Sequence, residues 1–335
     1  MLELEHIGLT QMPKAPQRDA RSIVTITESP YYGALAIDAL TTWQSTSPAA
    51  IFDNQSYTNY VNGSLSFLGS DSQIKLGGLT ISGAIGFGNS LGFLSAGSLE
   101  LQRSGTITFG GYDDIIISHD ASIAGKIFLG SGSDALATDR SFYSSGVIDF
   151  GPGGDVMSIV SGTNDGKLIF GLDTDSDSDR IQASISFEFS PDLIYGNLSD
   201  DFTGDLNGLP IPGPLLINNG TIVMGGGGDY ITGVVNNGTI LMGSGDDEVV
   251  CPSSPGNGFW DGGIGTDTLR LPDGTYSATQ ARKGLVINGS TFAGFEKISS
   301  SPPLFSDQVT PVPILEFLAG TYVITDNGAS IIYSA

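Results

Sequence analysis

Seven aspartates recur in this chain at a fixed distance from a glycine, and their carboxylates are the groups best placed to do chemistry. Each stands nine residues after the glycine that opens a segment such as GTITFGGYDD or GKIFLGSGSD. The seven are Asp114, Asp134, Asp155, Asp175, Asp229, Asp247 and Asp267. Carboxylates beside the carbonyl groups of glycine turns are the ligands that calcium prefers, so the pattern predicts a column of calcium ions. The alternative is that these aspartates only begin turns.

The segments that carry the aspartates repeat about every 20 residues. Their first glycines, from Gly105 to Gly258, are 20, 21, 20, 54, 18 and 20 residues apart. Two earlier copies, which begin at Gly63 and Gly83, keep the apolar pattern but lack the aspartate. We therefore expect the aspartate column to begin near Asp114.

Within each copy, alternating apolar residues predict short strands that have one buried face. Ile107 and Phe109 stand two and four residues after the first glycine, and Ile127 and Leu129 repeat this spacing. A glycine turn, the aspartate and a second apolar run follow. A unit of this length suits one coil of a solenoid, in which stacked coils pair their strands and bury a continuous core. We predict an all-β fold, a parallel β-solenoid (β-roll or β-helix) of about nine or ten coils with non-repeating β caps at both ends.

Asparagines repeat as well. The Asn-Asn-Gly corners before Thr221 and Thr239 stand one coil apart. We expect these asparagines to stack as a ladder, which is a structural role.

The glycine turns resemble the nonapeptide G-G-x-G-x-D-x-U-x of RTX proteins, the hemolysin-type calcium-binding repeats. The best match is GGIGTDTLR from Gly262, and the turns from Gly130, Gly151 and Gly243 follow it closely. The resemblance covers residues 105–298 and implies a parallel β-roll that binds calcium between successive turns. The glycines that it assigns to the ion sites are Gly130, Gly132, Gly151, Gly153, Gly225, Gly227, Gly243, Gly245, Gly263 and Gly265. The chain has about one motif per coil where the family has two, which predicts a single column of ions.

The repeat divides the chain into three parts. Residues 63–298 are the expected solenoid, and an insertion at residues 196–214 interrupts its spacing. Residues 1–62 lack the repeat and are expected to cap the array, to attach it to a partner, or to do both, because an open end exposes unpaired strand edges. Residues 299–335 combine a linker with strand-like runs of the kind that pair with another chain. The insertion is equally well a binding loop or a harmless bulge.

The charge balance restricts the partners of the chain. It has 36 acidic and 13 basic residues and a formal net charge of −23. Such a chain lacks the basic clusters that nucleic acids and anionic membrane surfaces require, and it should attract divalent cations. Cys251 is the only cysteine, so an intrachain disulfide is excluded. No signal peptide or membrane-spanning run is visible, so we expect a virion protein or an extracellular or cell-surface protein exported without an N-terminal signal.

Residues of the usual catalytic types are sparse. His6 and His119 are far apart in the sequence, and no glycine-rich phosphate loop precedes a helix. A glycosidase needs only two carboxylates, and the nearest candidates are Asp200, Asp201 and Asp205 on the insertion.

These observations favour a non-enzymatic structural or adhesive protein on a calcium-stabilised solenoid. It would serve at a cell surface, in a secreted matrix, or in a virion as a fibre, spike or decoration subunit. We expect a homo-oligomer or a larger surface assembly, with glycans as a further class of partner. The alternative is a polysaccharide-degrading β-helix enzyme, such as a tailspike-type glycosidase or lyase, with a groove lined by Trp260, Tyr230 or Tyr112.

Overall fold

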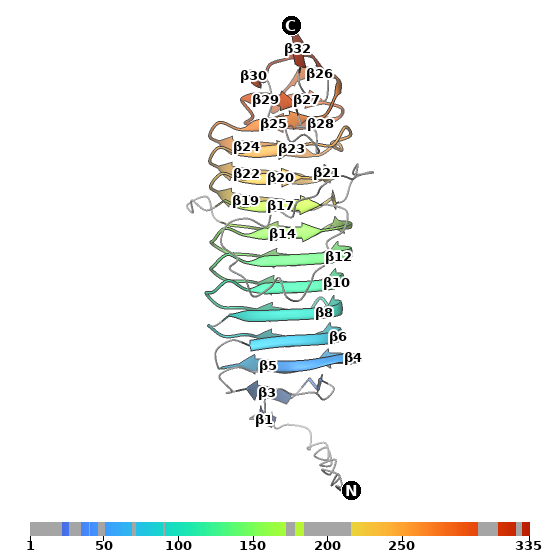
Figure 1. The fold of residues 1–335 in the computed structure, drawn as a ribbon, viewed down its shortest axis with the longest axis vertical. Helices are drawn as coiled ribbons and strands as arrows, with labels where there is room; N and C mark the ends of the chain where they lie inside the picture. The colour runs from blue at the N-terminus through green and yellow to red at the C-terminus, as the bar shows by residue number, and fades with distance from the viewer. Residues whose placement is uncertain are drawn as a thin grey trace, which may run out of the picture.

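The computed structural model of the chain is built from β-strands stacked along one long axis (Figure 1). It describes residues 22–26, 35–39, 41–45, 51–68, 72–89, 91–171, 178–183, 216–300, 314–325 and 330–335. Strand β1 (Ser22–Ile26) lies at one end of the stack and β32 (Ser330–Ser334) at the other. No helix among the described residues is long and apolar enough to cross a membrane.

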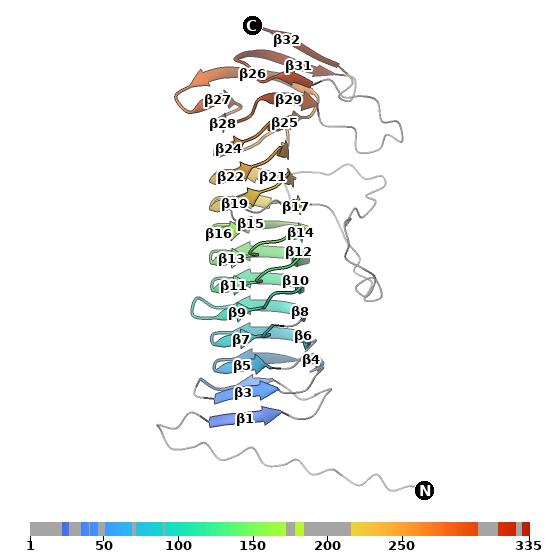
Figure 2. The ribbon, with the colours of Figure 1, turned by 90° about the vertical axis from the view of Figure 1, so that its left-hand side faces the viewer.

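One long side of the stack is a parallel sheet to which each coil contributes a strand (Figure 2). After β1, its strands are β3 (Thr41–Ser45), β5 (Ser64–Phe67), β7 (Ala84–Gly86), β9 (Thr106–Thr108), β11 (Lys126–Phe128), β13 (Val147–Asp149), β16 (Lys167–Ile169), β19 (Thr221–Gly226), β22 (Thr239–Ser244), β24 (Phe259–Ile264) and β28 (Ser290–Ala293). We call it the first sheet.

The second sheet faces the first across the core and is also parallel up to its last strand. Its strands are β2 (Ala36–Ile37), β4 (Ile51–Val61), β6 (Ser72–Ile81), β8 (Gly92–Leu101), β10 (Ile115–Ile123), β12 (Ala135–Ser144), β14 (Val156–Ile159), β17 (Arg180–Ala183), β20 (Tyr230–Thr232), β23 (Glu248–Val250), β25 (Thr268–Leu271), β29 (Lys297–Ser300) and the antiparallel β30 (Ile314–Glu316). A third, short run consists of β15 (Gly162–Asn164), β18 (Leu216–Asn218) and β21 (Val234–Asn236).

The register places equivalent apolar residues directly above one another. Ile107 pairs with Ile127, Ile127 with Ile148, and Ile148 with Leu168, and all four side chains are fully buried. Aromatic residues stack in the same way, with 4.2 Å between the ring centroids of Phe87 and Phe109. The alternation of the sequence therefore produces one continuous apolar column, and the predicted parallel β-solenoid is confirmed, with about nine turns at a spacing of about 20 residues.

The two ends of the stack differ. On the N-terminal side the parallel pairing continues before Gly63, because β1 pairs with β3 and β2 with β4. At the C-terminal end, antiparallel strands close both sheets. Strand β27 (Gly284–Ile287) pairs with β28 and β26 (Gly274–Ala281), and β26 also pairs with β31 (Gly320–Thr325), which pairs with β32.

The predicted insertion at residues 196–214 lies outside the described residues, but the strands around it show where it enters. Residues 184–215 separate β17 from β18 in the sequence, whereas Gly233 alone separates β20 from β21 in the next coil. Arg180 still pairs with Tyr230, and Leu216 with Val234. The extra residues are thus added between two strands of a single coil, and they leave the register of the stack unchanged.

A buried aspartate ladder as candidate functional site

A column of buried aspartates lies at the corner where the chain enters the second sheet. Each aspartate directly precedes a strand of that sheet, from β10 to β25. Its members, each at most 2% exposed, are Asp114, Asp134, Asp155, Asp179, Asp229, Asp247 and Asp267. The column begins at Asp114, as predicted. We call it the aspartate ladder.

One member of the ladder was not predicted. Asp175, which the spacing from Gly166 indicates, lies outside the described residues, and Asp179 occupies the ladder position in that coil. This turn has extra residues, so counting forward from the glycine stops too early. Counting backward from the strand finds the residue, because the buried apolar Ile181 follows Asp179 by two, as Leu136 follows Asp134.

Each carboxylate of the ladder bonds one coil to the next. The backbone N–H of Asp114 donates to Oδ1 of Asp134 at 2.7 Å, and the N–H of Asp134 donates to Oδ1 of Asp155 at 2.8 Å. The same bond recurs up to Asp267, whose Oδ1 accepts from the N–H of Asp247 at 2.9 Å. The backbone hydrogen bonds between strands are interrupted at the corner. There the carboxylate accepts a hydrogen bond from a buried backbone N–H, which would be costly to bury without a partner.

Other residue types continue the ladder at its two ends. The N–H of Gly92 donates to Oδ1 of Asp114 at 2.6 Å, so a residue without a side chain can begin it. The N–H of Asp267 donates to Oε2 of Glu296 at 2.9 Å. Sequence reasoning missed Glu296, although it precedes β29 just as each aspartate precedes its own strand.

The second carboxylate oxygen sets the electrostatics of the ladder. Among the described residues, the Oδ2 atoms of Asp114, Asp134, Asp247 and Asp267 are buried and have no hydrogen-bond partner. Burial removes water from these carboxyls and raises the pKa of Asp114, Asp134 and Asp267 to about 7, and that of Asp247 to about 6, although the backbone hydrogen bonds act in the opposite direction. These four carboxyls therefore change charge near neutral pH.

The glycines assigned to the ion sites form the turns beside the ladder, and all of them have positive φ. In Gly132, for example, φ is 134°, which favours glycine. The turns also stack too closely for a side chain. A Cβ on Gly153 would lie 1.7 Å from the carbonyl oxygen of Gly132. Turn conformation and stacking therefore account for these glycines, with or without an ion.

A calcium ion at this site would be bound by oxygen atoms of the ladder and of the turns. It needs six to eight oxygen ligands. Within the described part of the chain, no group of three or more histidine, cysteine, aspartate or glutamate residues could hold a metal ion. The oxygens with the most capacity left for an ion are the Oδ2 atoms, which lack a hydrogen-bond partner, together with the backbone carbonyls of the turns.

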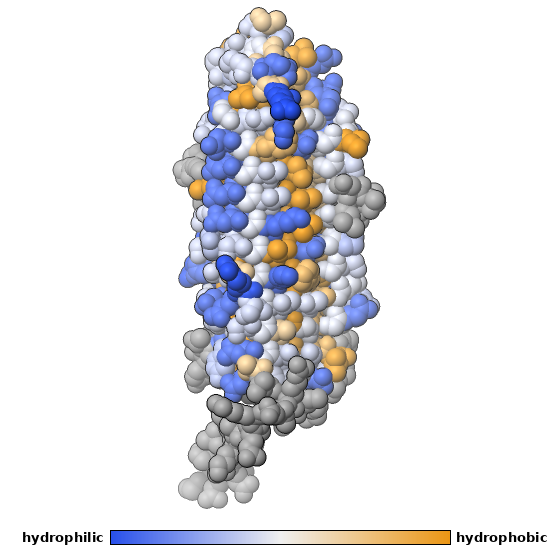
Figure 3. Space-filling view, turned by 180° about the vertical axis from the view of Figure 1, so that it is seen from behind, coloured by the Kyte–Doolittle hydropathy of each residue, from blue (hydrophilic) through white to orange (hydrophobic). Residues whose placement is uncertain are grey.

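The predicted asparagine ladder is present and lies along another corner of the coils. Asn164 donates through Nδ2 to Oδ1 of Asn218 at 2.8 Å, and Asn218 donates in the same way to Asn236. All three are fully buried. An outer row runs beside them, in which Asn237 donates to Asn219 at 3.1 Å. On the rear face of the molecule, hydrophilic and hydrophobic side chains gather in columns that run along the axis (Figure 3).

The three aromatic residues that the enzyme alternative would place in a groove differ in their burial. Trp260 is fully buried in the first sheet and stacks on Phe292, so it lines no surface groove. Tyr112 is 53% exposed, and the ring of Tyr230 lies 5.5 Å from the guanidinium of Arg180. The candidate carboxylates Asp200, Asp201 and Asp205 lie outside the described residues, as does His6.

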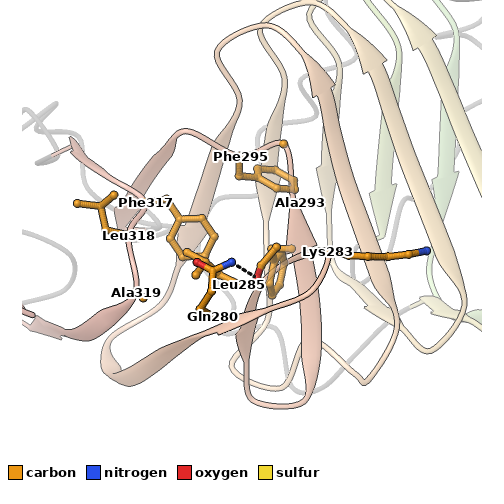
Figure 4. Close-up of a pocket in the computed structure, with 11 residues that line it drawn as sticks. Gln280, Lys283, Leu285, Ala293, Phe295, Phe317, Leu318 and Ala319 are labelled. Carbon is orange, nitrogen blue, oxygen red and sulfur yellow. Dashed lines mark hydrogen bonds between the residues drawn. The ribbon is translucent and has the colours of Figure 1, made fainter.

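A small cavity of about 210 Å³ lies at the C-terminal cap (Figure 4). Phe295, Phe317 and Leu285 line it, and Gln280 donates to the backbone oxygen of Gly284 at 3.1 Å. Its polar side chains are those of Gln280 and Lys283, and no carboxylate is among its described lining residues. The cavity has the composition of a packing gap between the cap and the last coil.

Comparison of the chain with protein-family models, with curated proteins and with solved structures finds no match. The class of protein is therefore defined by the fold and the site. The chain is an acidic parallel β-solenoid with aspartate and asparagine ladders buried along its corners.

Proposed function

We propose that this chain is a non-enzymatic structural or adhesive protein, a stiff acidic rod at a cell surface, in a secreted matrix or in a virion. The observation that supports the proposal is the unbroken stack of in-register coils with polar ladders at its corners. Each coil adds ~4.8 Å of length. The buried carboxylates connect coils to one another, and the column they form is closed to a substrate.

The test of this role combines the shape of the chain in solution with a search for catalysis. Small-angle scattering of the full chain should give the cross-section of a single rod. Incubation with neutral and acidic polysaccharides should release no reducing ends and no unsaturated products. Cleavage that is lost when Asp200, Asp201 or Asp205 is changed to Asn would replace the structural role with the glycosidase or lyase alternative.

We propose further that calcium is the cation that this rod uses, as the likeness of its turns to RTX repeats implies. The support is the set of buried Oδ2 atoms that lack a hydrogen bond, at Asp114, Asp134, Asp247 and Asp267. When these carboxyls are ionised, a divalent cation would offset the repulsion between neighbouring coils. The chain's own part is to hold the carboxylates in one column and to bring the turn carbonyls close to it.

Calcium binding is tested by thermal unfolding with calcium and with excess chelator, at about pH 8, which lies above the pKa of Asp114, Asp134, Asp247 and Asp267. A higher melting temperature in calcium supports the proposal. The matched variant is Asp134→Asn, which keeps an Oδ1 acceptor but loses the charge, so it should gain less from calcium. Equal melting temperatures with and without calcium would leave the aspartates as corner caps alone.

A further inference from the structure

The C-terminal antiparallel sheet is the uncharged end of a strongly charged molecule. Strands β26, β31 and β32 contain eight, six and five residues, and none of these residues is Asp, Glu, Lys or Arg. The chain as a whole is 15% charged with a net charge of −23. Two copies of such a chain repel each other, and this sheet is where they could approach with the least repulsion.

Strand β32 is the outer strand of that sheet (Figure 2). Among the described strands it pairs with β31 only. Its inner face is fixed, because Ile331 and Tyr333 pack on the core and the Tyr333 hydroxyl donates to the backbone oxygen of Ala319 at 2.8 Å. Its outer face carries Ile332, which is 61% exposed. An uncharged edge strand with an exposed isoleucine is a template for a further strand.

The sequence of β32, Ser-Ile-Ile-Tyr-Ser, reads nearly the same in both directions. When it pairs antiparallel with its own copy about Ile332, Ser330 faces Ser334 and Ile331 faces Tyr333. Residues directly opposite in an antiparallel pair point to the same face. The two Ile332 side chains therefore meet on the outer face, and the Ile331–Tyr333 pairs continue the inner face.

We propose that β32 binds a second copy of this chain, strand to strand and antiparallel, in the register that places Ile332 opposite Ile332. The pairing joins two uncharged sheets into one and connects two rods end to end about a two-fold axis, the commonest symmetry of homodimers. It builds on the structural role proposed above, for which it supplies the assembly. One short strand forms the contact, so the association is concentration-dependent.

Sedimentation velocity of the full chain over a wide range of concentrations tests the pairing. The wild type should shift reversibly from monomer to dimer. Ile332→Glu and Ile332→Lys should each remain monomeric, because like charges then meet at the two-fold axis. A mixture of these two variants should form a heterodimer, because only this register brings the two substituted positions together. Melting curves check that the variants are folded.

The matched control is Ile264→Glu, at an isoleucine that is 78% exposed on the turn side of β24. It should dimerise like the wild type. A wild type that is monomeric throughout, an Ile332→Glu variant that still dimerises, or an Ile264→Glu variant that loses dimers would each overturn the pairing. None of these outcomes affects the structural role, which is tested separately by small-angle scattering and by the search for polysaccharide cleavage.

Discussion

At the scale of single residues, the ladder aspartates combine a hydrogen bond with a titration. Oδ1 accepts a hydrogen bond from the preceding coil. In Asp114, Asp134, Asp247 and Asp267, Oδ2 is buried without a hydrogen bond, so burial favours the neutral carboxylic acid of these four residues in the folded chain. A proton can stabilise these carboxyls at low pH, and the proposed cation would stabilise them at high pH. These two effects predict opposite dependences on pH.

The first prediction concerns pH in the absence of divalent cations. The folded pKa of Asp114, Asp134 and Asp267 is about 7, above the ordinary 3.8, so the folded chain holds protons that the unfolded chain releases. This contribution to stability is complete below about 3.8 and is lost as the pH rises through about 7. In chelator, the melting temperature should therefore fall between about pH 5 and about pH 8.

The steepness with which the melting temperature falls with pH shows whether the ladder carboxyls cause the fall. Asp134→Asn removes one titrating group, so the variant should lose less stability over this range than the wild type does. A wild-type melting temperature that stays flat over the same range would show that the carboxyls are already ionised in the folded chain. In calcium the fall should become shallower, because an ion takes the place of the proton.

The second prediction separates the hydrogen bond from the charge. Asp134→Ala leaves the buried N–H of Asp114 without its acceptor, and this should cost about 1–3 kcal/mol of the free energy of unfolding. Asp134→Asn keeps an oxygen at the same place and should cost less. Urea unfolding of the two variants provides the comparison. Equal losses would mean that the N–H finds another partner or water.

At the scale of the element, the turns depend on glycine for two reasons at once. Gly245 has φ of 135°, and a Cβ there would lie 1.6 Å from the carbonyl oxygen of Gly227 in the coil below. The requirement for glycine comes from the close stacking of the coils, and the same requirement recurs in each turn. Gly86 in β7 is under no such restriction, because a Cβ there meets nothing within 4 Å.

The third prediction compares these two kinds of glycine. Gly245→Ala should be strongly destabilising, by several degrees in melting temperature, because strain and overlap act together. The control is Gly86→Ala in β7, where a Cβ meets nothing within 4 Å and which should be near neutral. If both variants melt at the wild-type temperature, then the turns can relax, and neither strain nor overlap explains why these positions are glycine.

At the scale of the whole molecule, stability is shared between neighbouring coils. Each coil contacts only the coils above and below, so a defect in one coil is transmitted through its two interfaces. The strands that surround residues 184–215 pair directly from coil to coil, as β14 with β17 and β17 with β20. The stack is therefore complete without the residues between β17 and β18.

The fourth prediction follows from the direct pairing of the strands on either side of residues 184–215. Replacing residues 184–215 with a two-residue link, like the one between β14 and β15, should leave a single cooperative melting transition close to that of the full chain. Loop shortening changes the closure entropy only modestly. Two separate transitions, or a large loss of stability, would mean that the insertion supports the solenoid and is more than an addition to its surface.

The sequence predicts the fold well because the solenoid is a one-dimensional pattern. The alternation around Ile107 and Ile127 fixes which face of each strand is buried, and the repeat of about 20 residues fixes the stacking. The asparagine ladder at Asn218 and Asn236 follows from the same repeat. Side chains at equivalent positions must lie above one another, whatever their type.

The sequence by itself therefore determined the repeat, the buried columns and most positions of the aspartate ladder. Only the tertiary structure decided that Asp179 joins the ladder, that Glu296 ends it, and that Trp260 is core. Counting residues from one glycine to the next fails where the turns differ in length. The direction of a side chain depends on the coil that packs against it. The same packing buried the carboxyls and raised their pKa, because desolvation comes from neighbours that are distant in sequence.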